Sequence, residues 1–174
     1  LLDVRHDDLE FLPQDSSIRQ SKRHVDEALG GSAVAELVLQ GDGDRMRKPD
    51  VLVAIEKLAE STTKSSDVKL EQANSSASVT EVLRTLHQFF SGNNQAQLPE
   101  DQASLSQLQV LFENQGPDAA NRWVTTDWSE TRLGFRLNWR EATAYGPFIE
   151  KLELTAQKLL PNDIEFVLTG FAVI

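Results

Sequence analysis

The residues that most often bind metal ions in proteins are scattered along this chain. His6, His24 and His87 are far apart in the sequence, and none of them has a partner at the spacing of a metal ligand. A metal site needs several ligands that cluster around one point. We therefore expect surface or structural roles for the three histidines and no bound metal.

Two glycine-containing segments resemble ion-binding loops but lack the residues that such loops need. Asp42-Gly43-Asp44 is similar to the start of a calcium loop, whose fifth and twelfth positions supply oxygen ligands, but those positions hold Met46 and Val53. Gly30-Gly31 follows an expected helix rather than a strand, and the chain has no Gly-Lys-Ser/Thr motif. We therefore expect neither a calcium loop nor a phosphate loop.

The residue types of covalent catalysis form no recognisable pattern. The chain has no cysteine and no serine in a G-x-S-x-G turn. Carboxylates such as Asp7, Asp8 and Glu130 are numerous, as expected with 27 acidic against 17 basic residues. We therefore predict no catalytic residues and no cofactor, and we interpret the protein as a non-enzyme.

A row of arginines is the strongest candidate for a binding surface. Residues 131–139 alternate between apolar and polar side chains, which places Arg132, Arg136 and Arg140 on the water-facing side of one strand. Two interpretations remain open: a solvated face that balances nearby acidic residues, or the polar wall of a substrate path or docking face. Trp128, at the tip of the expected hairpin, is predicted to be exposed and available to a partner or ligand.

The composition limits the classes of function. The net charge of -10 repels phosphate backbones, so we expect no nucleic-acid partner. With 40% hydrophobic residues, the 174-residue chain can form a single domain, residues 1–174, with a sizeable core. No run approaches the roughly 20 apolar residues that span a bilayer. Both ends of the sequence are apolar, which favours a domain taken from a longer chain; a terminal strand buried in the fold is the alternative.

Hydrophobic periodicity, capping residues and breakers predict ten elements. In chain order they are a helix at 17–29, a strand at 33–40, a helix at 49–61, a weak strand at 68–73, helices at 79–91 and 102–115, strands at 123–127 and 131–139, a helix at 145–160 and a strand at 164–169. The strand at 33–40 is apolar on both faces except at Glu36, which predicts a central position in a sheet.

Helix ends and inward-facing side chains follow from the same patterns. Asp15 or Ser16 can cap the first helix, Gly30-Gly31 can end it, Ser78 begins a capping-box pattern, and Asp101 can cap the helix that follows.

The periodicity also assigns side chains to the core. We expect the strand face that carries Leu133 to be buried, and Trp123 and Trp139 to pack in the core. Phe90 and Leu111 are predicted to lie on the inner faces of their helices.

The element order indicates a fold class. It reads β–α–β, a two-helix insertion over about residues 78–115, a β-hairpin, and then α–β. We interpret this order as an α+β fold of the ferredoxin-like, split βαβ type, with a mixed or antiparallel sheet and helices packed on one face.

Several short motifs, taken in order, resemble one known family. They are the LPQD loop at residues 12–15, the helix from Arg19 to Gly31 that ends in Leu-Gly-Gly, residues 48–52 followed by 55–58, residues 123–127 followed by 131–133, and Leu168-Thr169-Gly170. This series is similar to the extracytoplasmic loops of exporters of the resistance–nodulation–division (RND) superfamily, and most similar to the MMPL-type branch of lipid and hydrophobe exporters. The polar insertion at residues 61–78 departs from the family pattern.

The resemblance implies a porter domain on the periplasmic (extracytoplasmic) side of the bacterial inner membrane, as part of an integral membrane protein. Such a domain forms part of the path of lipids or other hydrophobic molecules, and contacts the other extracytoplasmic loop and the transmembrane helices of the same transporter. The proton-relay carboxylates of the family lie in those helices, so the chain is not active alone. The Asp15–Gly31 segment looks more like the second of the two family loops.

A different hypothesis is a free-standing ligand-binding or regulatory module with a ferredoxin-like sheet, whose arginine-lined face holds a small anion or a partner strand. The full-length reading frame separates the two hypotheses, because an RND loop is flanked on each side by an apolar run of about 20 residues. The RND hypothesis also predicts that the two chain ends lie close together on one side of the fold.

Overall fold

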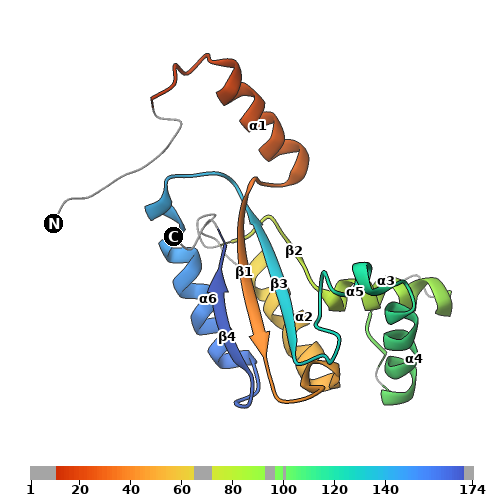
Figure 1. The fold of residues 1–174 in the computed structure, drawn as a ribbon. Coiled ribbons are helices and arrows are strands. Elements are labelled where there is room, and N and C mark those ends of the chain that lie inside the picture. Colours follow the sequence, from red (N-terminus) through yellow and green to blue (C-terminus); the bar gives the residue numbers. More distant parts are fainter. Residues whose placement is uncertain (1–10, 65–71, 93–96, 100, 171–174) are drawn as a thin grey trace.

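The computed structural model describes residues 11–64, 72–92, 97–99 and 101–170. Its elements are α1 (Ser17–Leu29), β1 (Ala33–Gln40), the 3₁₀ helix η1 (Arg45–Arg47), α2 (Pro49–Lys64), β2 (Ser75–Ala77), α3 (Val79–Ser91), α4 (Gln102–Glu113), α5 (Pro117–Ala120), β3 (Glu130–Leu137), the 3₁₀ helix η3 (Ala142–Tyr145), α6 (Gly146–Leu159) and β4 (Glu165–Thr169). The α+β class predicted from the sequence is confirmed (Figure 1).

The four strands form one antiparallel sheet in the order β2-β3-β1-β4. The predicted central position of β1 is confirmed, because β1 pairs with β3 on one side and with β4 on the other. In the register Leu37 lies beside Leu133 and also beside Leu168, so alternate residues of the three strands share a face.

One face of the sheet is buried against helices. Ala35, Leu37 and Leu39 of β1 and Leu133 and Phe135 of β3 have no exposed surface, which confirms the predicted orientation of β3. Helices α2 and α6 lie behind the sheet in the view of Figure 1 and contribute buried aliphatic and aromatic side chains to the same core. Burial of these apolar groups is the main force that stabilises such a two-layer arrangement.

The opposite face, which we call the open face, is turned toward the viewer in Figure 1. Its residues come from the other set of alternating positions. They are Val34, Glu36, Val38 and Gln40 of β1, Glu130, Arg132, Gly134 and Arg136 of β3, and Glu165, Val167 and Thr169 of β4. Val167 is 65% exposed, so the open face includes accessible apolar surface.

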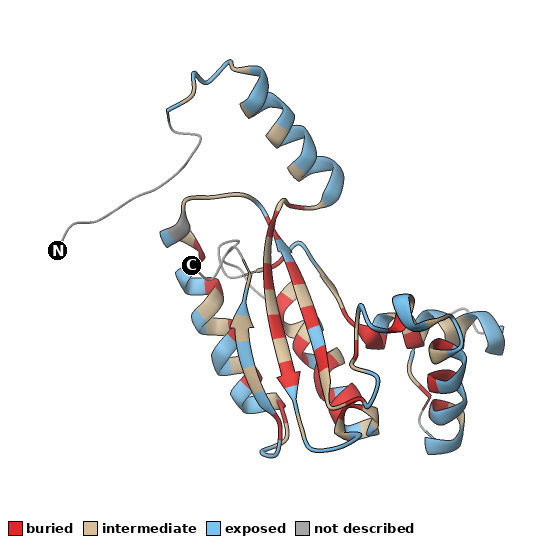
Figure 2. Ribbon diagram, in the orientation of Figure 1, coloured by how far each residue is buried: buried red, intermediate tan, exposed pale blue. Residues whose placement is uncertain are grey.

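The predicted first helix is confirmed as α1. The Ser16 side chain caps it by accepting a hydrogen bond from the Arg19 backbone at 3.4 Å. None of its residues is buried, as Figure 2 shows. Its contact with the body of the fold includes Trp139, whose backbone N–H donates to Asp26 Oδ2 at 3.4 Å and whose ring lies under the Lys22 ammonium group.

The double glycine allows the chain to pass directly from α1 into β1. Gly30 adopts the left-handed conformation at the helix end, with φ of 68°. Gly31 has φ of 118°, and a β-carbon there would lie 2.4 Å from the carbonyl oxygen of Leu137. Only glycine fits so close to the backbone of β3.

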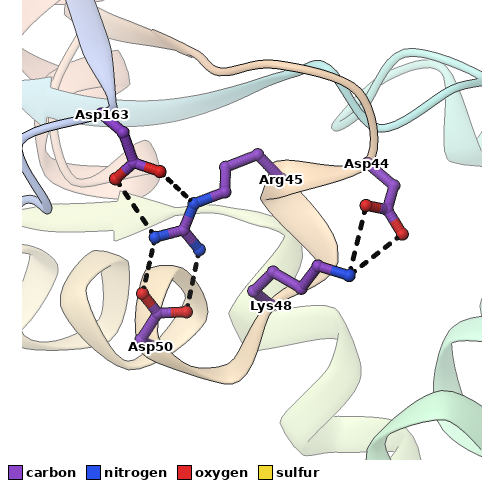
Figure 3. Close-up of polar contacts among 5 residues, drawn as sticks. All are labelled: Asp44, Arg45, Lys48, Asp50 and Asp163. Atoms are coloured by element: carbon purple, nitrogen blue, oxygen red, sulfur yellow. Dashed lines mark hydrogen bonds and ion pairs between the residues drawn. The ribbon is translucent and has the colours of Figure 1, made fainter.

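Arg45 joins three elements by ion pairs (Figure 3). Its Nη1 and Nη2 donate to the two carboxylate oxygens of Asp50 at 2.9 and 2.7 Å, and its Nε donates to Asp163 Oδ2 at 2.5 Å. η1, the first turn of α2 and the turn before β4 are thereby tied together. The hydrogen bonds from Arg45 lower the pKa of both Asp50 and Asp163.

The predicted strands are only partly correct. The segment 123–127 is not a strand, because its only strand-type pairing among the described residues is a single bridge between Val124 and Thr131. The same edge of β3 is occupied beyond that point by β2, whose Ala77 pairs with Gly134. The weak strand predicted at 68–73 falls mostly outside the described residues, and β2 begins at Ser75.

Both helices of the predicted insertion are present as α3 and α4, but two inward assignments are wrong. Phe90 is 59% exposed and Leu111 is 38% exposed. Gln109 is buried in place of Leu111, and its Nε2 donates to the carbonyl oxygen of Arg47 at 2.9 Å. The other inward assignments in α4, Leu105, Leu108 and Phe112, are confirmed, because all three are buried.

The capping residues of these helices are correct in position. Asp101 accepts a hydrogen bond from the Ser104 backbone at 2.8 Å, as predicted. Ser78 is the residue before α3, but its hydroxyl bonds to the Thr80 hydroxyl at 2.7 Å rather than to a backbone N–H. Within the described ranges, no helix has the length and apolar character needed to cross a membrane.

Candidate functional site

The candidate site is a pocket on the open face of the sheet. It has a volume of about 480 Å³ and lies between the paired strands β1 and β3 and the segment 121–126 that leads into β3. We call it the open-face groove. Its lining residues are Glu36, Val38, Asn121, Arg122, Trp123, Val124, Thr125, Thr126, Glu130, Thr131 and Arg132.

A short antiparallel pairing holds the segment 121–126 beside β3. The Arg132 backbone N–H donates to the Trp123 carbonyl oxygen at 3.2 Å, and the Thr125 N–H donates to the Glu130 carbonyl oxygen at 3.1 Å. Val124 is buried on the core side. Trp123 follows a turn in which its own backbone N–H and that of Val124 donate to the Ala120 carbonyl oxygen at 2.9 and 3.1 Å, and Trp123 and Thr125 both line the groove.

Arg132 links the two walls of the groove. Its Nε donates to the carbonyl oxygen of Arg122, which holds the guanidinium group against the segment that faces it. In the register Arg132 lies beside Val38, and Val38 lies beside Val167. A guanidinium group and two valines therefore follow one another across three strands of the open face.

The groove carries charged groups of both signs. Arg122 and Arg132 contribute guanidinium groups, and Glu36 and Glu130 contribute carboxylates. In the described part of the chain none of these four side chains takes part in an ion pair within 4.0 Å. These groups, with the indole of Trp123, can bind a ligand by charge, hydrogen bonding and stacking.

Of the three arginines in the predicted row, only Arg132 lines the groove. Arg132 lines the groove, whereas Arg136 lies on the same exposed face beside Val34 and outside the groove lining. Arg140 lies beyond the end of β3 and is half-buried, and its backbone N–H donates to Tyr145 Oη at 2.8 Å. The chain leaves the strand after Leu137, so the alternation that placed Arg140 in the row does not apply to it.

The prediction that Trp128 is exposed is wrong, because its side chain is only 1% exposed. Trp128 adopts φ of 59°, a left-handed conformation that is uncommon for a bulky residue and directs the indole inward. Its Nε1 donates to Glu113 Oε1 at 2.7 Å, its ring packs edge-on against Phe112, and the Arg47 guanidinium lies 4.9 Å from the ring centre. Trp128 therefore attaches α4 to the sheet and is not part of the groove.

Trp123 and Val38 are the functional candidates that the sequence did not single out. Trp123 and Trp139 were expected in the core, and both are half-buried and pack against it, but Trp123 also lines the groove. The remaining lining residues come from distant parts of the chain and meet only in the fold.

Asp127 lies in the turn next to the groove and remains ionised at neutral pH. Hydrogen bonds from the hydroxyl groups of Thr125 and Ser129, and from the Ser129 backbone, lower the pKa of Asp127 to about 2. The Ser129 hydroxyl lies 2.8 Å from Asp127 Oδ1. This carboxylate stabilises the turn that precedes β3.

The described residues contain no group of three or more histidine and acidic side chains arranged to hold a metal ion. Comparisons of the chain with protein-family models, with curated proteins and with solved structures find no match.

Proposed function

We propose that this chain is an extracytoplasmic porter domain of an RND-type membrane exporter, and that its open face forms part of the path of lipids or other hydrophobic molecules. The observation that carries the proposal is the position of the first and last strands. Glu36 near the start of β1 pairs with Thr169 at the end of β4, so the chain enters and leaves the sheet at the same end. A domain inserted between two membrane spans needs this arrangement.

The chain ends themselves, residues 1–10 and 171–174, lie outside the described residues. Two of the motifs that resemble the RND family occupy these strand connections. The double glycine at 30–31 precedes β1, and Leu168-Thr169-Gly170 closes β4. Both lie where a porter domain would connect to its membrane spans, which supports the proposal.

We also propose the finer assignment of the fold as a ferredoxin-like, split βαβ porter domain. The connections β1–α2–β2 and β3–α6–β4 are two β–α–β units, and their strands interleave in the order β2-β3-β1-β4. Helices α3, α4 and α5 lie between β2 and β3, at the place of the predicted insertion. This order supports the assignment.

The open-face groove is the part of the domain best suited to a substrate path. Val38 and Trp123 give it apolar surface, and Arg132 gives it a polar wall. Val167 extends the apolar surface beyond the groove toward β4. The partners in this proposal are the second extracytoplasmic loop and the transmembrane helices of the same transporter.

The alternative proposal is a free-standing ligand-binding or regulatory module. The exposed Arg136 favours it, because no ion pair of this side chain occurs among the residues described, and it could meet an anion or a partner strand at the face beside β2. The full-length reading frame decides between the two proposals. An apolar run of about 20 residues on each side supports the exporter, and a reading frame without such runs contradicts it.

Export itself can be tested in cells that depend on the full-length protein. We expect Val38→Asp, which places a charge on the floor of the groove, to increase retention of single-chain amphiphiles in the cells. Leu154→Ser is the matched control, because Leu154 is exposed on α6 and lies outside the groove. If Val38→Asp leaves amphiphile retention at the wild-type level while the protein is present in the membrane, the groove is not part of the path.

A further inference from the structure

The charges of the open-face groove do not neutralise one another. Elsewhere in this molecule opposite charges close into ion pairs, as Arg45 does with Asp50 and Asp163. In the groove, the hydrogen bond to the Arg122 carbonyl draws the Arg132 guanidinium toward the far wall. Glu36 lies beside Gly134, which has no side chain to pair with it. Glu130 and Arg132 share the open face of β3, but among the described residues neither they nor Glu36 and Arg122 form an ion pair within 4.0 Å.

A ligand that carries both charges fits this arrangement better than a ligand with one charge. An anionic ligand gains from the guanidinium groups of Arg122 and Arg132 but is repelled by the carboxylates of Glu36 and Glu130. A cationic ligand is attracted by the two carboxylates but repelled by the two guanidinium groups. A zwitterion can place its anion beside the guanidinium groups and its cation beside the carboxylates, so that each of its charges meets an opposite charge.

The aromatic ring in the groove favours a particular kind of cation. Trp123 lines the same hollow as Glu36 and Glu130. Substituted ammonium groups bind to the faces of aromatic rings, and tryptophan is the most effective of them. A substituted ammonium group therefore matches this part of the groove.

Apolar surface continues from the groove toward the edge of the sheet. Val38 lies between Arg132 on β3 and Val167 on β4 in the sheet register. Val167 is largely exposed. An alkyl chain that extends from a head group in the groove can cover these two valines and remove them from water.

From these contacts we propose that the open-face groove binds the zwitterionic head group of a lipid amphiphile. Arg122 and Arg132 bind its phosphate, and Glu36, Glu130 and the Trp123 ring bind its ammonium group. The first part of its acyl chain lies along the open face toward β4. That the ligand is a lipid rests on the proposed function. The inference adds that its head group is zwitterionic.

The test compares four amphiphiles that share a ten-carbon chain and differ in the head group. They are decylphosphocholine, which is zwitterionic, decyl maltoside, which is neutral, decanoate, which is anionic, and decyltrimethylammonium, which is cationic. Each is titrated below its critical micelle concentration into the ¹⁵N-labelled 174-residue chain, and the indole N–H signals are followed by NMR. Trp123→Phe identifies the Trp123 signal by its loss.

We expect decylphosphocholine to shift the Trp123 signal and to bind roughly tenfold more tightly than each of the other three, the effect of one additional charge-assisted contact. The buried Trp128 signal should not move. Glycerophosphocholine, which has the same head group without the alkyl chain, should bind more weakly than decylphosphocholine, because it does not cover the two valines. Equal affinity of the two compounds would assign the site to a free zwitterion rather than a lipid. Equal affinities for the four amphiphiles within twofold, or no shift of Trp123 with any of them, would overturn the inference.

Two variants separate the charges. Glu36→Gln should weaken phosphocholine binding and remove its advantage over decanoate, and Arg132→Gln should remove its advantage over decyltrimethylammonium. Arg136→Gln is the matched control, because Arg136 is on the same strand and face but outside the groove. Thermal unfolding of each variant establishes that it is folded. Loss of the preference in Arg136→Gln to the same extent as in Arg132→Gln would contradict the proposed site.

The outcome for this inference is independent of the outcome for the proposed function. Equal binding of all four amphiphiles rejects the zwitterionic head group but agrees with a hydrophobic substrate path. A reading frame without flanking membrane spans rejects the exporter, whatever the preference among the head groups.

Discussion

The bond between Trp128 and Glu113 should be a measurable link between the helical insertion and the sheet. Trp128 Nε1 donates to Glu113 Oε1 at 2.7 Å, and the same carboxylate pairs with Arg47. A hydrogen bond to a charged group contributes about 1.5–3 kcal/mol to stability. Glu113 is partly exposed, so water replaces part of the lost bond, and we expect a value near the lower limit, about 1.5 kcal/mol.

A double-mutant cycle isolates this contribution. Trp128→Phe removes the N–H donor but keeps an aromatic ring in the buried site, Glu113→Ala removes the acceptor, and the double variant removes both. Urea unfolding followed by far-ultraviolet circular dichroism gives the free energy of unfolding of each protein, because loss of a tryptophan alters the fluorescence signal. We expect a coupling energy of about 1.5 kcal/mol between the two positions.

The matched control for this cycle combines Trp123→Phe with Glu113→Ala. Trp123 lines the groove and forms no hydrogen bond with Glu113 in the described structure, so the two changes should be additive. A coupling energy of Trp128 with Glu113 below about 0.5 kcal/mol, the usual error of additivity, would refute the assigned link.

Two further predictions concern stability. Arg45→Gln should lower the melting temperature at neutral pH, because Asp50 and Asp163 lose their shared partner. Arg45 lowers the pKa of both carboxyl groups below 3.8, so the stabilisation is present above that pH and is lost as the pH falls through the lower folded-state values. The difference in melting temperature should therefore shrink as the pH falls below 3.8, and a constant difference would contradict the pairing. Leu133→Ala should cost about 2–5 kcal/mol because the side chain is fully buried, whereas Arg136→Gln, on the exposed face of the same strand, should change stability by less than about 0.5 kcal/mol; comparable losses in urea unfolding would mean that the two faces of β3 are misassigned.

Elements with a strong local signal could be predicted from the sequence. Strict alternation around Leu133 gave both the strand and the direction of its side chains, because a shift of one residue would expose the whole apolar set. The first helix was predicted with its capping residue Ser16 and its terminal Gly30, since the physical requirements of both helix ends are local.

Features that depend on contacts between distant segments could not be predicted in the same way. The backbone of Trp128 is left-handed only because the surrounding residues hold it there, so its inward direction has no local signal. The apolar stripe predicted the inner face of α4, but the burial of the polar Gln109 depends on its bond to the Arg47 carbonyl oxygen in η1, which has no local signal. The segment 123–127 has strand-forming residues, but it begins in a turn, where the Val124 N–H donates to the Ala120 carbonyl oxygen, and makes only one bridge to β3, at Thr131.

Only one wall of the candidate site was predicted from the sequence. Arg132 was identified from the alternation of β3, and it does line the groove. The opposite wall comes from the segment 121–126, and the floor includes Glu36 and Val38 of β1, which are remote in the sequence. The local pattern of either segment does not show that they lie side by side in the fold.

The most direct test of the central claim is the location of this domain in the cell. The chain has no cysteine, so Leu154→Cys on the exposed side of α6 introduces a single thiol into it. In the full-length protein, with the parent protein as control for thiols elsewhere, we predict that the variant is found in the membrane fraction and is labelled by a membrane-impermeant maleimide in cells whose inner membrane is intact. Labelling only after the inner membrane is broken, or recovery of the protein outside the membrane fraction, would contradict the exporter proposal.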